Sequence, residues 1–535
     1  MTVAATTGVA TVRILVADPI ANDGVERLRA AGEVVVATGL SLEELKVRIA
    51  DVDALVVRSE TKVTAEVFEA APRLRVVGRA GVGVDNIDLE AATRHGVLVL
   101  NAPTGNTIAA AEHTIGMMLA MARNISRADA SMHAGRWDRK AFMGTELREK
   151  TLGLLGLGKI GFEVARIASQ GLKMRVIADD PLVTAERAEQ AGAELVDFET
   201  LLAQSDFLTV HVPLNDKTRG VIGAAELARM KKGARLINVA RGGIIDEQAL
   251  ADAVREGHIG GAAIDVFTKE PILPENPLLS VPELVLTPHL GASTTEAQVN
   301  VATDVADQIV QYLGGVGPRY AVNLPSIQPE EMARLQPYLI LAEKMGSLAA
   351  QLAGEKVSRV VCSYAGELSK VEPSPLTAEV LRGLFSHFTD TRVNAINAKL
   401  VAKDHGVAVE ERTTTRDLDH ADALLVEVIG GTRLTLVGTQ FEGQPRITRI
   451  DDFRVDMDPT GLFLVVQHND RPGVVAKVSG LLASNDINIA GIELGRDRPR
   501  GRAVMLIQVD DPVGPELQLA LQAVADLESL RVVTL

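Results

Sequence analysis

Two series of short apolar runs fill the first half of the chain, and both have the pattern of parallel α/β structure. From Val12 to Leu100, the runs VRILVA, ALVV, LRVVG and GVLVL alternate with helix-like stretches such as residues 41–50. A second series begins at Leu152 with TLGLLG and continues through RVIA, DFLTVHV, ARLINVA, AAIDV and LVLTP. The pattern predicts two doubly wound units with parallel sheets, the second with six strands.

The rest of the chain predicts a hinge, a mixed α+β region and a terminal βαββαβ module. A helix with one apolar face over residues 112–126 separates the two series, and Gly and Pro gather in GGVGPRYAVNLPSIQP. From Phe463 the order is strand, helix, strand, strand, helix, strand. We therefore predict a discontinuous first domain and three further domains, with bounds 10–103 plus 290–320, 104–289, 321–457 and 458–535.

Composition narrows the possible functions. The formal net charge of −15 and a sequence pI near 5.3 argue against a nucleic-acid or anionic-membrane surface. Cys362 is the only cysteine, which excludes an intrachain disulfide and fits a reducing cytoplasm. The ten histidines are scattered without metal-ligand spacing, and no run of eighteen uncharged apolar residues suggests a membrane span. We expect a cytoplasmic protein with no metal, no nucleic-acid partner and no membrane contact.

A glycine-rich segment, Gly156-Leu157-Gly158-Lys159-Ile160-Gly161, follows the first strand of the second series and opens a helix. The bare pattern is weak, but this context is the one in which it binds a dinucleotide. Gly156 allows the tight turn, Gly158 lets the backbone approach a pyrophosphate, and Gly161 allows close packing of helix and strand. The N–H groups at the start of the helix then face the anion.

Two acids, Asp179 and Asp180, end the next strand, where a carboxylate accepts hydrogen bonds from ribose hydroxyls and repels a 2′-phosphate. This predicts NAD rather than NADP, and we favour Asp180 as the ribose ligand. The alternative is that the pair caps a helix before Pro181. A second glycine segment, residues 81–86, lacks the third glycine and a matching helix, so we reject it as a nucleotide site.

Three strand ends of the second series carry unusual polar residues: Arg241, Glu270 and His289. Open α/β sheets place their chemistry at such ends. The segments GLGKIG, NVARGGIIDE, AAIDVFTKEP and TPHLGAST resemble the D-isomer-specific 2-hydroxyacid dehydrogenases, a family with Rossmann-like domains, over about residues 10 to 320. RSETKVT, GRAGVGVDNID, NAPTGNT and the late HNDRPG…INI narrow the resemblance to the long D-3-phosphoglycerate dehydrogenases.

The resemblance implies that His289 is the active-site base, Glu270 its partner and Arg241 the residue that grips the substrate carboxylate. These residue types suit the chemistry, because oxidation of a secondary alcohol needs a base for the hydroxyl proton and a planar fork for a carboxylate. Taken singly, each could instead be structural: a core histidine, a surface glutamate or a capping arginine.

The same resemblance implies further contacts. Around the substrate it places Arg58, Ser59, Arg79, Gly81 and Asn106, of which the two arginines could supply positive charge for a phosphate or could be ordinary surface residues. Around NAD it adds Lys159, Ile160, His211, Pro213, Ala240, Asp265, Gly291 and Ala292, with Asp265 orienting the nicotinamide carboxamide.

The terminal module resembles an ACT domain, a fold that pairs edge to edge and holds small amino acids at the interface. His468, Asp470 and Asn488 match its ligand loop and facing strand, and the family implies L-serine as effector. Asp470 before Pro472 could instead be a turn former, and Asn488 an ordinary strand residue. For the intervening region, solvated surface is the favoured interpretation of its basic residues, and we assign no site there.

The function expected from these patterns is NAD-dependent oxidation of 3-phosphoglycerate to 3-phosphohydroxypyruvate in serine synthesis, by a homo-oligomer inhibited by L-serine. Two alternatives remain. A glyoxylate or hydroxypyruvate reductase shares every catalytic motif, so specificity depends on the phosphate arginines and the terminal module. A non-enzymatic NAD-sensing corepressor with the same fold would not need an amino-acid sensor.

Overall fold

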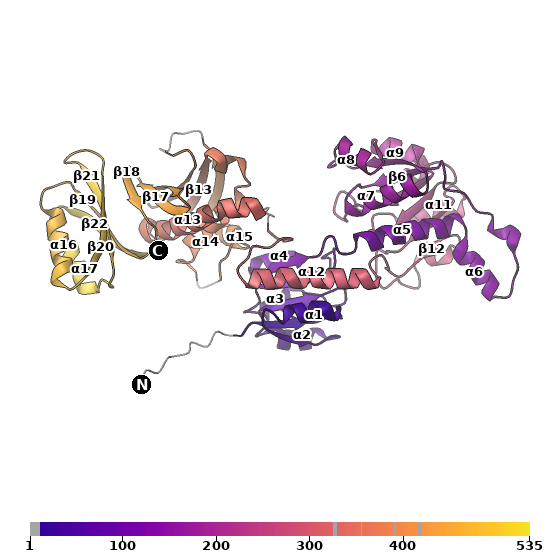
Figure 1. Ribbon diagram of the computed structural model, residues 1–535, viewed down its shortest axis with the longest axis horizontal. Helices are drawn as coiled ribbons and strands as arrows, with labels where there is room; N and C mark the ends of the chain where they lie inside the picture. Colours follow the sequence, from indigo (N-terminus) through magenta and orange to yellow (C-terminus); the bar gives the residue numbers. More distant parts are fainter. Residues whose placement is uncertain (1–10, 325–328, 355, 390–391, 415–419) are drawn as a thin grey trace.

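The computed structural model describes residues 11–324, 329–354, 356–389, 392–414 and 420–535. Residue 10, where the first domain is predicted to begin, lies outside this part. Four sheets form an elongated row, with the second sheet at one end, the first in the middle and the two C-terminal sheets at the other end (Figure 1). This arrangement confirms the predicted fold class.

The first sheet is parallel, with the order β2-β1-β3-β4-β5. Its strands are β1 Arg13–Val16, β2 Glu33–Val36, β3 Ala54–Val57, β4 Val76–Arg79 and β5 Leu98–Asn101. Its helices are α1 Asn22–Leu28, α2 Leu42–Ile49, α3 Ala65–Glu69 and α4 Leu89–Arg94. The later helix α12 (Thr295–Leu313) returns to cover one face, where Val301, Val305 and Ile309 join the core of this sheet.

The second sheet is also parallel and has the order β12-β11-β10-β9-β6-β7-β8. Its strands are β6 Thr151–Leu155, β7 Arg175–Asp179, β8 Glu194–Leu195, β9 Phe207–Val210, β10 Arg235–Asn238, β11 Gly261–Ile264 and β12 Val285–Leu286. The helices are α5 Thr107–Ala122, α6 Ile125–His133, α7 Lys159–Arg166, α8 Ala185–Gln190, α9 Phe198–Gln204, α10 Ala224–Arg229 and α11 Glu247–Arg255, with short helical turns η1 Arg139–Phe142, η2 Ile167–Gly171 and η3 Pro277–Ser280.

Two details of this unit differ from the prediction. The sheet has seven strands instead of six, because β8 is only two residues long and leaves almost no apolar pattern. The helix predicted over residues 112–126 is two helices, α5 and α6, divided at Asn124, whose φ of 53° is incompatible with a continuous right-handed helix.

The third sheet is mixed, with the order β14-β13-β15-β16-β17-β18. Its elements are α13 Pro329–Ala353, β13 Val357–Ala365, η4 Gly366–Lys370, α14 Ser374–Phe385, α15 Ala398–Asp404, β14 Ala408–Thr413, β15 Ala423–Gly430, β16 Arg433–Phe441, β17 Gln444–Ile450 and β18 Phe453–Met457. A loop and the end of α15 of this unit contact the first unit, where Asn394 Nδ2 donates to Gly96 O at 2.7 Å and Arg94 pairs with Asp404 at 3.2 Å.

The fourth sheet is antiparallel and has the order β20-β21-β19-β22. Its elements are β19 Leu462–Asn469, α16 Val474–Ser484, β20 Ile489–Arg496, β21 Arg502–Val509, α17 Pro515–Gln522 and β22 Leu527–Thr534, which is the predicted βαββαβ order. The two helices pack on one face. On the other face, Phe463, Val465 and Leu506 belong to the same apolar core as the third sheet.

No helix in the described ranges is long and apolar enough to cross a membrane. Among the same residues, no group of three or more His, Cys, Asp or Glu side chains is arranged to hold a metal ion.

The crossing of α13 and α14 predicts a strong size limit at Gly346, where an added Cβ would lie 2.0 Å from the carbonyl oxygen of Val380. We expect Gly346→Ala to destabilise the protein by about 1–3 kcal/mol through overpacking and to lower the midpoint of thermal unfolding. Gly480, inside α16, has no neighbour within 4 Å, so Gly480→Ala should raise the midpoint through helix propensity. A Gly346→Ala midpoint at or above that of the wild type would contradict the proposed close contact.

Candidate functional site

A cavity of about 540 Å³ lies between the first two sheets, at the carboxyl ends of their strands. The structure brings together here all the residues predicted to contact substrate and all those predicted to catalyse. Its lining includes Arg58, Ser59, Arg79, Gly81, Asn106, Arg241, Glu270 and His289, together with Ala292 from the predicted cofactor set.

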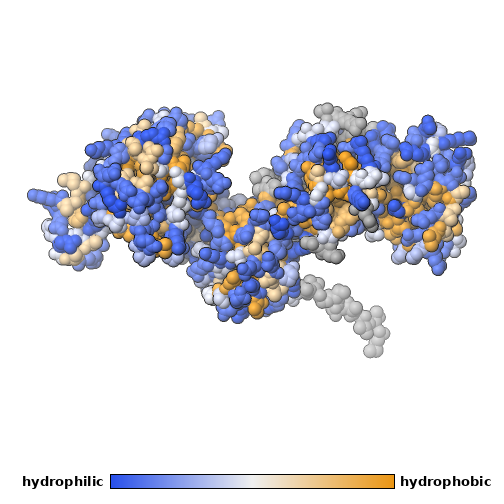
Figure 2. All heavy atoms as spheres, turned by 180° about the vertical axis from the view of Figure 1, so that it is seen from behind, coloured by the Kyte–Doolittle hydropathy of each residue, from blue (hydrophilic) through white to orange (hydrophobic). Residues whose placement is uncertain are grey.

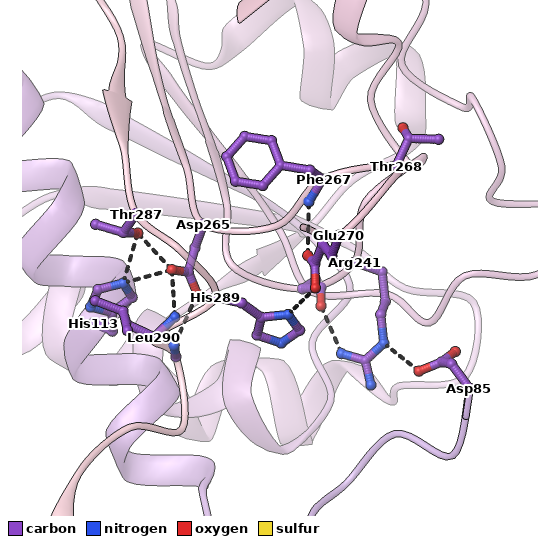
Figure 3. A network of polar contacts seen from close by, with 12 residues as sticks. Asp85, His113, Arg241, Asp265, Phe267, Thr268, Glu270, Thr287, His289 and Leu290 are labelled. Atoms are coloured by element: carbon purple, nitrogen blue, oxygen red, sulfur yellow. Dashed lines mark hydrogen bonds and ion pairs between the residues drawn. The ribbon is translucent and has the colours of Figure 1, made fainter. Parts of the chain in front are cut away.

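The pair His289 and Glu270 faces this cavity (Figure 3). His289 Nδ1 lies 2.7 Å from Glu270 Oε2, and Glu270 also accepts a hydrogen bond from the Phe267 amide at 3.0 Å. Burial opposes ionisation of Glu270, but the hydrogen bonds from His289 and Phe267 lower its pKa below the ordinary value. The carboxylate therefore orients the imidazole and leaves Nε2 free to act on a bound molecule.

The backbone at His289 is held in an unusual conformation, with φ of 56°. A non-glycine residue in this region is strained by about 1–3 kcal/mol and needs support from its surroundings. The support comes from Asp265, whose carbonyl oxygen accepts the His289 amide at 2.8 Å and whose carboxylate accepts the amides of Leu290 at 2.7 Å and Gly291 at 2.9 Å.

Asp265 is fully buried and has two further partners that the sequence analysis missed. Thr287 Oγ1 donates to it at 2.6 Å, and His113 Nε2, from α5, lies 3.2 Å away (Figure 3). Burial opposes ionisation, yet these hydrogen bonds hold the pKa of Asp265 below its ordinary value. Asp265 therefore acts first as a structural anchor for the His289 loop; its predicted contact with a nicotinamide stays a prediction.

Three guanidinium groups, from Arg58, Arg79 and Arg241, line the cavity. Burial, then the charges of Arg241 and Arg58, lower the pKa of Arg79 to about 10, so that it remains charged at neutral pH. Arg79 Nε is buried and has no hydrogen-bond partner in the described part of the chain. Like charges at close range with an unpaired buried donor are typical of a site that receives an anion.

Two glycines make room for these arginines. A Cβ on Gly81 would lie 1.6 Å from Arg79 Nη1, and one on Gly83 would lie 1.9 Å from Arg241 Nη2. The segment around Gly81, which we rejected as a nucleotide site, thus packs directly against the guanidinium groups of Arg79 and Arg241.

The Arg58 loop is positioned by Asp18 and Asn86, neither of which the sequence analysis singled out. The buried carboxylate of Asp18 accepts the amides of Arg58 at 2.6 Å and Thr61 at 3.1 Å. Asn86 Nδ2 donates to the carbonyl oxygens of the same two residues, at 2.8 and 2.7 Å. In the sequence, the only indication of this role was that a polar residue, Asp18, follows the first strand.

The glycine loop has the geometry expected of a dinucleotide site. Gly156 has φ of 96°, and a Cβ on Gly161 would lie 2.3 Å from the carbonyl oxygen of Gly156. Gly158 precedes α7 with no side-chain cap, and a Cβ there would meet open space. The residues therefore fit the pyrophosphate of NAD, which helix N–H groups bind.

Asp180 closes one side of this loop, because its carboxylate accepts the amides of Leu157 at 2.8 Å and Leu182 at 2.9 Å. The helix-capping alternative is wrong, since α8 begins at Ala185 and is capped by Thr184. Burial, and then the charge of Asp180, raise the pKa of Asp179. Both acids lie at the end of β7, beside the glycine loop.

The remaining predicted cofactor residues follow the neighbouring strands. His211 and Pro213 follow β9, and Ala240 follows β10. An added Cβ on Gly156 would lie 2.8 Å from the carbonyl oxygen of His211, so this segment flanks the loop directly. The ammonium group of Lys159 lies 5.4 Å from the centre of the Tyr320 ring, and Ile160 occupies the next position in α7.

The predicted effector residues do not meet within one chain. His468 and Asp470 lie where β19 ends, whereas Asn488 precedes β20, which runs parallel to β19 and begins at the opposite end of the sheet. Asp470 accepts the Arg500 amide at 2.8 Å, Asn488 donates to Asp510 at 2.5 Å, and His468 is buried with Nε2 unpaired among the described residues. A site that uses all three therefore needs two chains.

His211 predicts a pH dependence of stability. Loss of hydration lowers its pKa from 6.5 to about 4. As the pH falls, the unfolded chain therefore binds a proton at this histidine before the folded chain does, which favours the unfolded state. The melting temperature should therefore fall as the pH is lowered from about 6.5 to about 4, and it should fall less in His211→Gln. His133→Gln, at a side chain 82% exposed, is the control that should keep the wild-type slope. Equal slopes in wild type and His211→Gln would contradict the shift.

Three family models match successive parts of the chain. The NAD binding domain of D-isomer specific 2-hydroxyacid dehydrogenases matches residues 115–291. The intervening domain of D-3-phosphoglycerate dehydrogenases matches residues 334–451, and the ACT domain matches residues 463–526. The chain therefore carries an NAD-binding domain, in agreement with the geometry of the glycine loop.

Full-length relatives extend this similarity. The D-3-phosphoglycerate dehydrogenase of Archaeoglobus fulgidus is 47% identical over 510 residues, which cover 94% of this chain and 96% of the relative. That of Bacillus subtilis is 41% identical over 526 residues, 98% of this chain and 99% of the relative. A solved glyoxylate reductase from Paecilomyes thermophila is 30% identical with a TM-score of 0.54, but it covers only 58% of this chain and 98% of its own. Because the similarity to the first two spans nearly the whole length, the chain belongs to the D-3-phosphoglycerate dehydrogenases, in the long form with intervening and ACT domains.

Proposed function

We propose that this protein oxidises 3-phospho-D-glycerate with NAD to 3-phosphohydroxypyruvate, the first step of L-serine synthesis. The observation that carries the proposal is one cavity in which three guanidinium groups converge beside the His289–Glu270 pair. The substrate has two anionic groups and a secondary alcohol, and the cavity offers a matching positive charge and a positioned base. Kinship with the long D-3-phosphoglycerate dehydrogenases supports the same substrate.

In the proposed reaction, His289 Nε2 removes the hydroxyl proton of the substrate. Glu270, ionised through its lowered pKa, fixes the tautomer that leaves Nε2 free and stabilises the imidazolium that forms. The glycine loop, with Gly156, Gly158 and Gly161, would hold NAD, which when bound would supply the hydride acceptor for the carbon that bears this hydroxyl. Arg241 holds the substrate carboxylate and polarises the oxygen that becomes a ketone.

The phosphate is assigned to Arg58 and Arg79 on the first domain, with Ser59, Gly81 and Asn106 as neighbouring contacts. The buried and unpaired Nε of Arg79, a hydrogen-bond donor, supports this placement. Asp179 and Asp180 place two carboxylates at the adenosine end of the cofactor site, where a 2′-phosphate would meet like charge, so the proposed cofactor is NAD rather than NADP.

A substrate panel tests this assignment. We expect turnover of 3-phosphoglycerate with NAD to exceed that with NADP, and Arg79→Ala to lower kcat/KM for 3-phosphoglycerate by about 10- to 100-fold through loss of a charge-assisted hydrogen bond. The kcat/KM for D-glycerate, which lacks the phosphate, should fall much less in the same variant. Arg29→Ala removes an exposed arginine of the same domain, paired with Glu26, and should leave both values unchanged. Equal losses on both substrates would remove Arg79 from the phosphate site.

The same panel separates the alternatives. A glyoxylate or hydroxypyruvate reductase would prefer the small unphosphorylated acids, which have no second anionic group for the arginines assigned here to a phosphate. A corepressor would bind NAD without turnover. The convergence of Arg58, Arg79 and Arg241 favours the phosphorylated substrate over both.

We also propose that the ACT domain binds L-serine between two copies of the chain. The opposite positions of Asp470 and Asn488 on the sheet support a shared site, because edge-to-edge pairing of two sheets can bring one end of each toward the other. A projecting arm of the second domain supports self-association as well. In α6 and the segment that follows it, the side chains of Ile125, Met132, Trp137 and Met143 are exposed. Figure 2 shows hydrophobic and hydrophilic surface side by side on this arm.

L-Serine should therefore lower activity without competing with NAD, by about 5- to 150-fold at most, the range of typical coupling energies. Asp470→Ala should weaken this inhibition, whereas Asp511→Ala, an exposed acid of the same domain, should not. Sedimentation velocity of the full chain measures whether it associates. An enzyme that ignores millimolar serine, or an Asp470→Ala variant inhibited like the wild type, would contradict the effector site.

A further inference from the structure

One ion pair spans the cavity between the first two domains. Arg241 Nε lies 3.2 Å from Asp85 Oδ2, and the two residues come from loops that follow β10 and β4, on different sheets (Figure 3). The Asp85 side chain is 68% exposed, so the domain core does not fix its position. The pair is therefore a direct polar link between the domain that carries His289 and the domain that carries Arg58 and Arg79.

The hydrogen-bond geometry of Arg241 shows which part of its guanidinium remains for a ligand. Nη1 donates to the carbonyl oxygen of Ala240 at 2.7 Å, which ties one edge of the fork to the backbone. The edge left for a two-pronged carboxylate contact is formed by Nε and Nη2. Asp85 occupies Nε of that edge, so a bound carboxylate and Asp85 compete for the same donor.

The negative charge of Asp85 is a second reason why it competes with a bound carboxylate. Among the described residues that line the cavity, Asp85 and Glu270 are the acids, and Glu270 is engaged with His289 and the Phe267 amide. Asp85 is therefore the carboxylate that faces the three arginines without a partner other than Arg241. Its charge also lies in the region that must accept the two anionic groups of the substrate.

We propose that Asp85 is a displaceable internal competitor: in the absence of substrate it binds Arg241 in place of the substrate carboxylate, and substrate binding releases it. This inference rests on the proposed function only for the identity of the substrate. Because the pair joins two domains, its release frees the Asp85 loop from the second domain when the carboxylate arrives. Asp85 thus reduces affinity and keeps Arg241 oriented across the empty cavity.

The test measures binding without turnover. Calorimetric titration of 3-phosphoglycerate into the full-length enzyme saturated with NADH uses two reduced partners that cannot react. Asp85→Asn keeps the shape and removes the charge, and Asp85→Ala is a second variant in case the amide forms new contacts. Because exposed ion pairs contribute about 0.4–1 kcal/mol in the upper part of their range, we expect the Kd to fall by about two- to fivefold in both variants.

Two controls test whether the change in Kd arises from competition between Asp85 and the substrate carboxylate. Glu60→Gln removes a negative charge from an exposed residue of the same domain that does not line the cavity, and its Kd should equal that of the wild type. D-Glycerate should gain as much affinity from Asp85→Asn as 3-phosphoglycerate does, because both carry the carboxylate. That titration remains informative even if the turnover assay shows that 3-phosphoglycerate is not the substrate.

A Kd that is unchanged or higher in both Asp85 variants would overturn the inference, and would assign to Asp85 a role in positioning Arg241 instead. It would leave the proposed reaction intact, because turnover by the wild-type enzyme decides that question separately. A gain for 3-phosphoglycerate without a gain for D-glycerate would also overturn it, since the competition would then concern the phosphate.

Discussion

The buried carboxylate of Asp265 is the constraint on which the proposed chemistry depends. It binds two consecutive backbone amides, a threonine hydroxyl and a histidine from α5, and so joins α5, the end of β11 and the loop after β12. These contacts fix the residues on both sides of His289 and so stabilise its left-handed backbone conformation. A neutral asparagine has only one acceptor oxygen and could not accept from all four donors, so this part of the fold requires an ionised carboxylate.

The anion site follows a different rule, since its parts come from separate domains. Arg58 and Arg79 stand on the ends of β3 and β4, whereas Arg241 stands on the end of β10. Each domain alone would hold mutually repelling or unpaired cations, and only their apposition creates a cavity suited to a substrate with two anionic ends. Affinity for such a substrate therefore depends on how the two domains are placed relative to each other.

The sequence predicts well those features that depend on local pattern. The parallel α/β character of the first two units, the glycine loop at Gly156 and the placement of Arg241, Glu270 and His289 at strand ends follow from periodicity and motif, and the structure brings the three residues together. Long-range partners left no local signal. Asp18 acts 40 residues from Arg58, His113 acts 152 residues from Asp265, and Asp85 acts 156 residues from Arg241. Even Asn488 and Asp470, close in a motif, lie at opposite ends of their sheet because β21 pairs between their strands.

The shared core of the two C-terminal units has a consequence for how such a chain can change over evolutionary time. Phe453, Val455 and Met457 of β18 pack in one apolar cluster with Phe463 and Leu506 of the ACT sheet. Gln351 of α13 exchanges two hydrogen bonds with the backbone of Thr534, both 2.9 Å long. A gene that lost only its last eighty or so codons would encode a protein with an open, water-exposed hydrophobic face, prone to aggregation. Deletions that remove only the ACT unit should therefore be selected against, because they expose the apolar surface that the intervening unit shares with it.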